Sequence, residues 1–193
     1  GLYLDAEGRR VLPGLRPDRL RCFVDLADPA KRTRADVAEA LQVLQELQQH
    51  VDVVLGLNGS EAAQVVGVLG GEWRGAPEDN TGAVQAAATI RRELGLDTVM
   101  VHLVAWAAAA GPTVPAGLGV DGFRCDDPRI TTGAGDHFNA GFFGSLLQGL
   151  DLQAALVVGG ATSGFYVREA RSPSRAEASD FLRRWAAQSM GQP

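Results

Sequence analysis

Residues 131–136, Thr-Thr-Gly-Ala-Gly-Asp, combine the residue types and the spacing best suited to chemistry in this sequence. After Gly135 the apolar residues recur at helical spacing, so we expect a glycine-rich loop that opens directly into a buried helix. The first turn of such a helix points unpaired N–H groups and the positive end of its dipole at one place, where an anion binds. One face of the helix should carry Phe138, Phe142, Leu146, Leu147 and Leu150.

Asp136 directly follows this expected anion site. A carboxylate is a poor ligand for a bound phosphate, but it is a good base for a hydroxyl group that attacks one. A second interpretation is that Asp136 only complements the helix dipole, a common use of aspartate in a first helical turn. The glycines before Asp136 and the Phe-Asn-Ala-Gly after it favour the catalytic interpretation.

The same run resembles the second signature of the ribokinase-like (PfkB) carbohydrate kinases, in which Asp-Thr-Thr-Gly-Ala-Gly-Asp precedes an aromatic residue and an Ala-Gly pair. The resemblance implies that the amides of Gly133, Ala134 and Gly135 form an anion hole for the transferred phosphoryl group. It also implies that Asp136 deprotonates the acceptor hydroxyl. Thr132, with the two glycines, would then contact the nucleotide, which is ATP.

A second polar pair, Asn58 and Glu61, follows an apolar run at 51–57 that we expect to be a buried strand. The pair resembles the family's Asn-x-x-Glu motif, which organises a hydrated Mg²⁺ ion near the nucleotide phosphates. The resemblance therefore implies that both residues order the metal ion and that Asn58 also contacts the nucleotide. Amide and carboxylate oxygens suit this ion. The same spacing is also a variant of the helical capping box, and both interpretations stay open.

Three stretches depart from the family pattern. Residues 102–107, after an expected strand at 97–103, replace Thr-Leu-Gly-x-x-Gly, so side chains stand where the backbone would approach the nucleotide. Ile130 replaces a family Asp that helps to hold a monovalent cation, and residues 169–172 replace a Gly-Ala stretch at the same cation site. We therefore expect potassium to change the rate and the nucleotide affinity little. His102 is either a substitute phosphate contact or a structural histidine at a strand end.

Apolar runs alternate with helical patterns along the chain, which predicts an α/β fold with a parallel sheet and helices on both faces. Both motif loops should leave the carboxyl ends of strands, where such sheets bind ligands.

A further strand is expected at 20–25 and ends in Asp25. Asp25 and Asp28 loosely resemble the family's Asp-Pro-Asn segment, or they cap the next helix. Hairpins are expected within 1–12 and from 111–115 to 120–125. The expected helices are 35–49, 61–69, 82–94, 152–167 and 175–187.

Small residues in the expected helix 152–167 should let it approach the helix after Asp136 closely. They are Gly159, Gly160, Ala161 and Gly164. In the family this region flanks the adenine pocket, so the resemblance places Gly164 against the nucleotide.

The composition excludes several classes of protein. With 193 residues and 46% hydrophobic content, the chain can bury one substantial core, so we expect a single domain, 1–193. A net charge of −5 without a basic stripe argues against nucleic acid or an anionic membrane as a partner, and no apolar run has the length of a membrane span. Cys22 and Cys125 are too few for a disulfide framework and fit a cytoplasmic protein. A homodimer is compatible with the sequence.

The resemblance covers nearly the whole chain and implies a ribokinase-like three-layer sandwich that lacks its N-terminal part and lid, because the family's sugar-gripping Asn-x-Asp or Gly-Gly segment is not present. We therefore expect the C-terminal, nucleotide-binding and catalytic part of an ATP- and Mg²⁺-dependent kinase. Its substrate would be a hydroxyl of a sugar or a related small alcohol, and the fragment alone should be inactive. The alternative is a non-catalytic relic that keeps the fold and binds a nucleotide, a phosphate or a partner protein.

Overall fold

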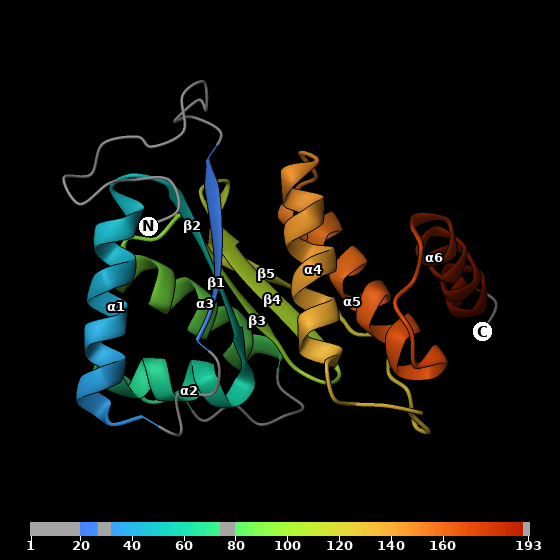
Figure 1. The fold of residues 1–193 in the computed structure, drawn as a ribbon, viewed down its shortest axis with the longest axis horizontal. Helices are drawn as coiled ribbons and strands as arrows, with labels where there is room; N and C mark the ends of the chain where they lie inside the picture. Colours follow the sequence, from blue (N-terminus) through green and yellow to red (C-terminus); the bar gives the residue numbers. More distant parts are fainter. Residues whose placement is uncertain (1–19, 27–31, 74–79, 191–193) are drawn as a thin grey trace.

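The computed structural model describes residues 20–26, 32–73 and 80–190, without the side chains of 188–190. The hairpin expected within 1–12 and Asp28 lie outside the described residues. One sheet stands between two layers of helices (Figure 1). Its strands are β1 Arg21–Asp25, β2 Asp52–Asn58, β3 Thr98–His102, β4 Trp106–Gly111 and β5 Val114–Asp121. The helices are α1 Arg34–Gln48, α2 Gly59–Val68, α3 Asn80–Leu94, α4 Ala134–Leu147, α5 Leu152–Glu169 and α6 Arg175–Met190.

The strands follow one another in sequence order across the sheet. β1, β2 and β3 are parallel, as the alternation of strands and helices predicted, whereas β4 and β5 run antiparallel to their neighbours. The prediction of a hairpin at 111–115 and 120–125 was wrong in position, because its strands are β4 and β5. The sequence concealed β4 because residues 107–110 are four alanines, a helix-favouring residue, and only burial between two helical layers makes them a strand.

The side chains of each central strand alternate between two cores, as the pleat of a strand requires. Val53, Leu55 and Leu57 of β2 face the core built by α1, α2 and α3. Val54 and, on β3, Met100 face the core built by α4 and α5. β1 lies where the sequence placed it, but it is only half-buried because it is the outer strand of the described sheet.

α4 and α5 pack against each other through glycines, as their small residues predicted. A β-carbon on Gly141 would lie 2.5 Å from Thr162 Oγ1 and 3.0 Å from the Cα of Gly159. One on Gly159 would lie 3.0 Å from the carbonyl oxygen of Phe138. The close contact presses Phe138, in the second turn of α4, against α5, and so fixes where α4 begins.

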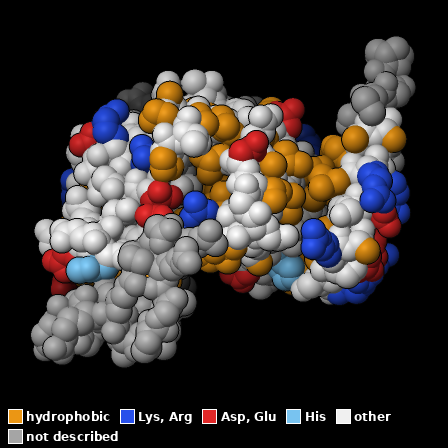
Figure 2. All heavy atoms as spheres, turned by 90° about the horizontal axis from the view of Figure 1, so that it is seen from above, with side chains coloured by type: hydrophobic (Ala, Val, Ile, Leu, Met, Phe, Trp, Pro, Cys, Tyr) orange, Lys and Arg blue, Asp and Glu red, His pale blue; other side chains and the backbone are white. Residues whose placement is uncertain are grey.

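The apolar face of α4 is shorter than predicted. Phe138, Phe142 and Leu146 are buried, but Leu147 is 59% exposed and Leu150 37%. The helix ends at Leu147, and Gly149 then adopts a φ of 83°, so the last two apolar residues leave the layer that buries the others. Seen from the end of the sandwich where α4 finishes, the surface carries apolar side chains in its middle (Figure 2).

α6 packs on α5 through an aromatic cluster of its own. Phe165, Phe181 and Ala161 are its buried members, with Phe123 and Trp185 packed against them. This confirms the amphipathic helix predicted near the end of the sequence. No helix in the described part of the chain is long and apolar enough to cross a membrane.

Candidate active site

The predicted loop and helix junction is present, and it lies at the end of the sandwich to which β1, β2 and β3 point (Figure 1). Gly133 precedes α4 with φ 86° and ψ 0°, in the left-handed region that favours glycine, and no side chain caps the helix there. The Ala134 amide, which the resemblance assigned to the anion hole with those of Gly133 and Gly135, instead donates to the Thr131 carbonyl oxygen at 3.1 Å. Within the described residues the amides of Gly133, Gly135 and Asp136 have no acceptor, so they remain available to an anion.

A cleft of about 420 Å³ opens beside this helix start. Its walls are largely apolar and come from the turn after β3, the end of β5 and one side of α5. Gly164, Asn58, Gly135 and Ala134 line the cleft, whereas Thr132 and Asp136 are exposed next to lining residues. The remaining lining residues include His102, Leu103, Val104, Trp106, Phe123, Thr131, Phe138, Gly160 and Ser163.

Asn58 and Glu61 form a complete capping box at the start of α2. The Glu61 amide donates to Asn58 Oδ1 at 3.0 Å, and the Asn58 amide donates to Glu61 Oε2 at 2.8 Å. Glu61 is only 6% exposed. The capping interpretation of this motif is therefore confirmed. The cap by itself does not decide whether the pair also orders a metal ion.

His102 is the last residue of β3, and it lines the cleft near the start of α4. Its ring stacks on Phe138 with centroids 5.3 Å apart, and its Cε1 is 3.2 Å from where a β-carbon of Gly135 would stand. Burial lowers the pKa of His102, while the charges of Asp25 and Asp136 act in the opposite direction. The imidazole is therefore neutral at pH 7 and can donate one hydrogen bond into the cleft.

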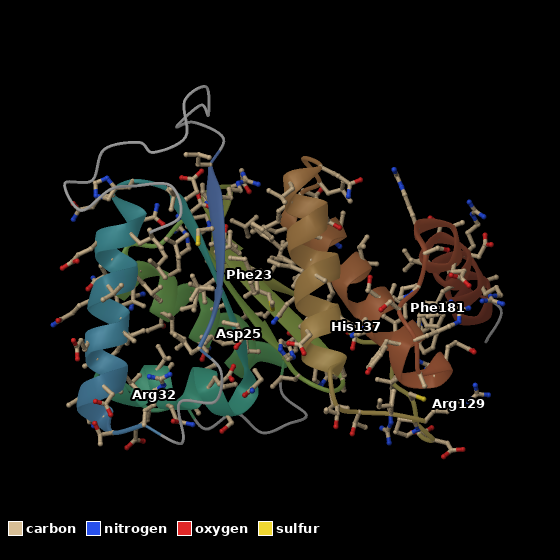
Figure 3. All side chains as sticks on the ribbon, in the orientation of Figure 1. Phe23, Asp25, Arg32, Arg129, His137 and Phe181 are labelled. Atoms are coloured by element: carbon tan, nitrogen blue, oxygen red, sulfur yellow. The ribbon has the colours of Figure 1, made fainter. Side chains whose placement is uncertain are left out.

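Asn139 is a buried polar residue beside the site, next in the chain to the lining residue Phe138, and it was not predicted from the sequence. Its Nδ2 donates to Asp25 Oδ2 at 2.9 Å, which joins the end of β1 to α4 (Figure 3 labels Asp25 on β1). Its Oδ1 is buried without a hydrogen-bond partner in the described structure. An asparagine one turn beyond Asp136 in an otherwise apolar helix was the available signal, because a buried amide needs partners.

The sequence model of the prokaryotic ketohexokinases matches residues 6–185. The chain belongs to the prokaryotic ketohexokinase family. A ketohexokinase of Haloferax volcanii is 35% identical over 170 residues, which are 83% of this chain and 41% of the relative. The chain thus spans about two fifths of the length of that curated relative.

Solved structures with a ribokinase-like fold are similar to this chain. Ribokinase of Thermotoga maritima superposes with a TM-score of 0.61 at 22% identity, over 85% of this chain and 57% of that one. An E. coli protein assigned as ribokinase II, in complex with ATP and Mg²⁺, gives a TM-score of 0.57 at 22% identity, over 83% and 47%. The predicted family and ribokinase-like fold class are confirmed.

The half-buried position of His102 at the end of β3 leads to a prediction about pH. The pKa of His102 is lower in the folded protein than its usual value of 6.5. At a pH below 6.5 the unfolded chain therefore binds more protons at this residue than the folded protein does. Above about pH 6.5, His102 should not affect the free energy of unfolding. At lower pH the free energy of unfolding should decrease, by at most about 1.4 kcal/mol per pH unit. Below the lowered pKa the loss levels off.

Denaturant unfolding at pH 7.5 and pH 5.5 measures this loss. In His102→Gln the difference between the two pH values should be smaller than in the parent protein, since glutamine does not titrate. Equal differences in the two proteins would show that burial of this imidazole does not couple folding to protonation.

Proposed function

We propose that the protein containing this chain transfers the γ-phosphoryl group of ATP to a hydroxyl group of a ketohexose or a closely related sugar. The observation that carries the proposal is the uncapped start of α4, where unpartnered amides and Asp136 meet beside a cleft of about 420 Å³. Membership of the prokaryotic ketohexokinase family supports the substrate class.

Asp136 acts as the general base. It is exposed in the first turn of α4, so its carboxylate can reach the hydroxyl of a sugar bound outside the helix. It accepts the proton as the hydroxyl oxygen attacks phosphorus. The amides of Gly133 and Gly135 stabilise the charge on the transferring group, and Ala134 contributes a small side chain between them. His102, neutral and adjacent to Gly135, is a further donor for a phosphate oxygen.

The cleft accepts the nucleotide. Its volume lies within the usual range for small-molecule pockets, and its walls are largely apolar, as a purine base requires. Gly164 lies at the wall, and a β-carbon there would lie 2.8 Å from Phe123 Cβ, so this position must stay small. Asn58 lines the cleft, and Thr132 follows the lining residue Thr131, so both are close enough to contact the phosphates of a nucleotide bound there.

Mg²⁺ fits the donors present, provided that it arrives with the nucleotide. The described residues contain no group of three or more His, Cys, Asp or Glu placed to hold a metal ion by themselves. Asn58 and Glu61 offer only oxygen atoms, which are already tied to the backbone, and so would order the ion through water. Mg²⁺ commonly combines retained waters, one or two carboxylates and substrate phosphates. Bound in this way, the ion neutralises phosphate charge.

A second candidate function is binding of a nucleotide or phosphate without catalysis. The turn after β3 favours it, because the side chains of Leu103 and Val104 line the cleft and Leu103 packs against Gly59. Side chains therefore occupy the space in which the wider family brings glycine backbone to the nucleotide.

The experiment is an assay of ADP release by the full-length protein with Mg-ATP and a panel of ketohexoses, aldohexoses and small alcohols. Ketohexose-dependent turnover is expected.

Ile130 supplies no carboxylate to a monovalent cation, so exchange of sodium for potassium in the assay buffer should change the rate little. Residues 1–193 alone should stay near background, because water would enter an acceptor site without its other wall. Nucleotide binding without turnover on any acceptor would establish the second candidate instead.

A further inference from the structure

His137 and Tyr166 form a stacked pair beside the signature loop, 131–136. Their ring centroids are 3.6 Å apart and the rings are inclined by 13°. His137 belongs to the first turn of α4, and Tyr166 to the last turn of α5 (Figure 3 labels His137). The function proposed above assigns neither residue a role.

Both rings hold carbonyl groups of the loop. His137 Nδ1 lies 2.7 Å from the carbonyl oxygen of Gly133, and the Tyr166 hydroxyl donates to the carbonyl oxygen of Thr132 at 2.9 Å. A carbonyl oxygen only accepts, so Nδ1 carries the proton in this contact. His137 Nε2 lies 2.8 Å from Ser172 Oγ, which fixes the ring from its other side.

These contacts determine where the neighbouring N–H groups point. In a trans peptide unit the C=O and the N–H lie in one plane and point in opposite directions. The carbonyl of Thr132 shares its peptide unit with the amide of Gly133, so Tyr166 directs that amide away from itself. The carbonyl of Gly133 also accepts from the His137 backbone amide at 3.1 Å, so two donors hold the peptide unit before Ala134. The amide of that unit donates to Thr131, so the unit is a fixed link between the amides of Gly133 and Gly135 on its two sides.

The left-handed conformation of Gly133 makes the loop dependent on this support. At φ 86° the backbone is strained for other residues, and a β-carbon would lie 3.1 Å from the Tyr166 hydroxyl oxygen. A glycine between two peptide units is also the freest part of a chain. Without the two ring donors, the loop would sample other orientations and present its amides less often.

We propose that His137 and Tyr166 are positioning residues that hold the signature loop so that its amides face the transferring phosphoryl group. This inference rests on the proposed function, because it assigns those amides their role in phosphoryl transfer. Neither side chain needs to touch the substrate, so the effect should appear in the transition state and not in nucleotide binding.

The test uses two losses and one rescue in the full-length protein. Tyr166→Phe removes one hydroxyl and keeps the stack, and His137→Phe removes both ring nitrogens and keeps an aromatic ring. His137→Asn restores a donor near the place of Nδ1. Ser145→Ala is the matched control, because it also deletes one hydroxyl that donates to a carbonyl, that of Gly141 at 2.8 Å, but far from the loop.

For Tyr166→Phe we expect kcat to fall about 10-fold, and for His137→Phe about 100-fold, with the KM for ATP changed less than about two-fold. Affinity for ADP with aluminium fluoride, a mimic of the transferring group, should fall in parallel while affinity for ADP alone stays constant. His137→Asn should recover part of kcat. Ser145→Ala should alter the melting temperature only. Unchanged kcat and unchanged analogue affinity in both loss variants would overturn the proposal.

Hydrogen–deuterium exchange keeps this result separate from that of the proposed function. If the parent protein shows no turnover with any acceptor, the proposed function fails, and exchange at residues 131–136 then decides the structural part. Faster exchange there in both loss variants, but not in Ser145→Ala, would support the positioning role. Exchange equal to that of the parent would reject it.

Discussion

Asp136→Asn should lower turnover by about two to four orders of magnitude, the usual contribution of a positioned general base. The fold and the affinity for ATP should stay nearly the same, because the amide is isosteric with the carboxylate and is compatible with a first helical turn. Asp136 is exposed at the start of α4, so the change removes a negative charge without opening a cavity.

The competing interpretation, that Asp136 only complements the dipole of α4, predicts the opposite pair of results. The substitution would then cost about 0.3–1 kcal/mol of stability and leave turnover largely intact. Melting temperature and kcat, measured on the same preparation, therefore separate the two. Asp151→Asn is the matched control, because Asp151 caps α5 through the Ala154 amide at 2.8 Å and lies outside the site. A less stable but fully active Asp136→Asn protein would end the catalytic assignment.

Gly141→Ala should destabilise the protein by about 1–3 kcal/mol, although alanine is the better helix former. The new β-carbon would lie 2.5 Å from Thr162 Oγ1 and 3.0 Å from the Cα of Gly159, so α4 and α5 must move apart. That movement shifts the helix that carries Asp136, and activity should fall together with stability.

Gly144→Ala provides the control within the same helix. A β-carbon at Gly144 meets nothing within 4 Å, so the substitution should raise stability by about 0.5–1 kcal/mol through helix propensity alone. Denaturant unfolding of the two variants should give changes of opposite sign. Two changes of the same sign would mean that α4 and α5 are less tightly packed than the described contacts require.

Local patterns were sufficient for most elements. The strands at β1, β2 and β3 and the helices α1, α5 and α6 were predicted within a few residues, because each has its own apolar periodicity and punctuation. The polyalanine strand β4 was not predicted, because its conformation depends on the layers that bury it. For Asn58 and Glu61, the sequence left capping and metal binding open, and the backbone geometry confirmed the cap.

The sequence by itself determined which candidate chemistry is proposed for this chain. The loop at 131–136, its junction with α4 and the family resemblance follow from residues that are adjacent in the chain, where spacing alone specifies geometry. Only the tertiary structure decided which distant residues contact the end of β1 and the loop at 131–136. Asn139 meets Asp25 from 114 positions away, and Tyr166 reaches Thr132 from 34. Such pairs form because the sheet and the glycine contact of α4 with α5 bring separate segments together, and no local pattern records that approach.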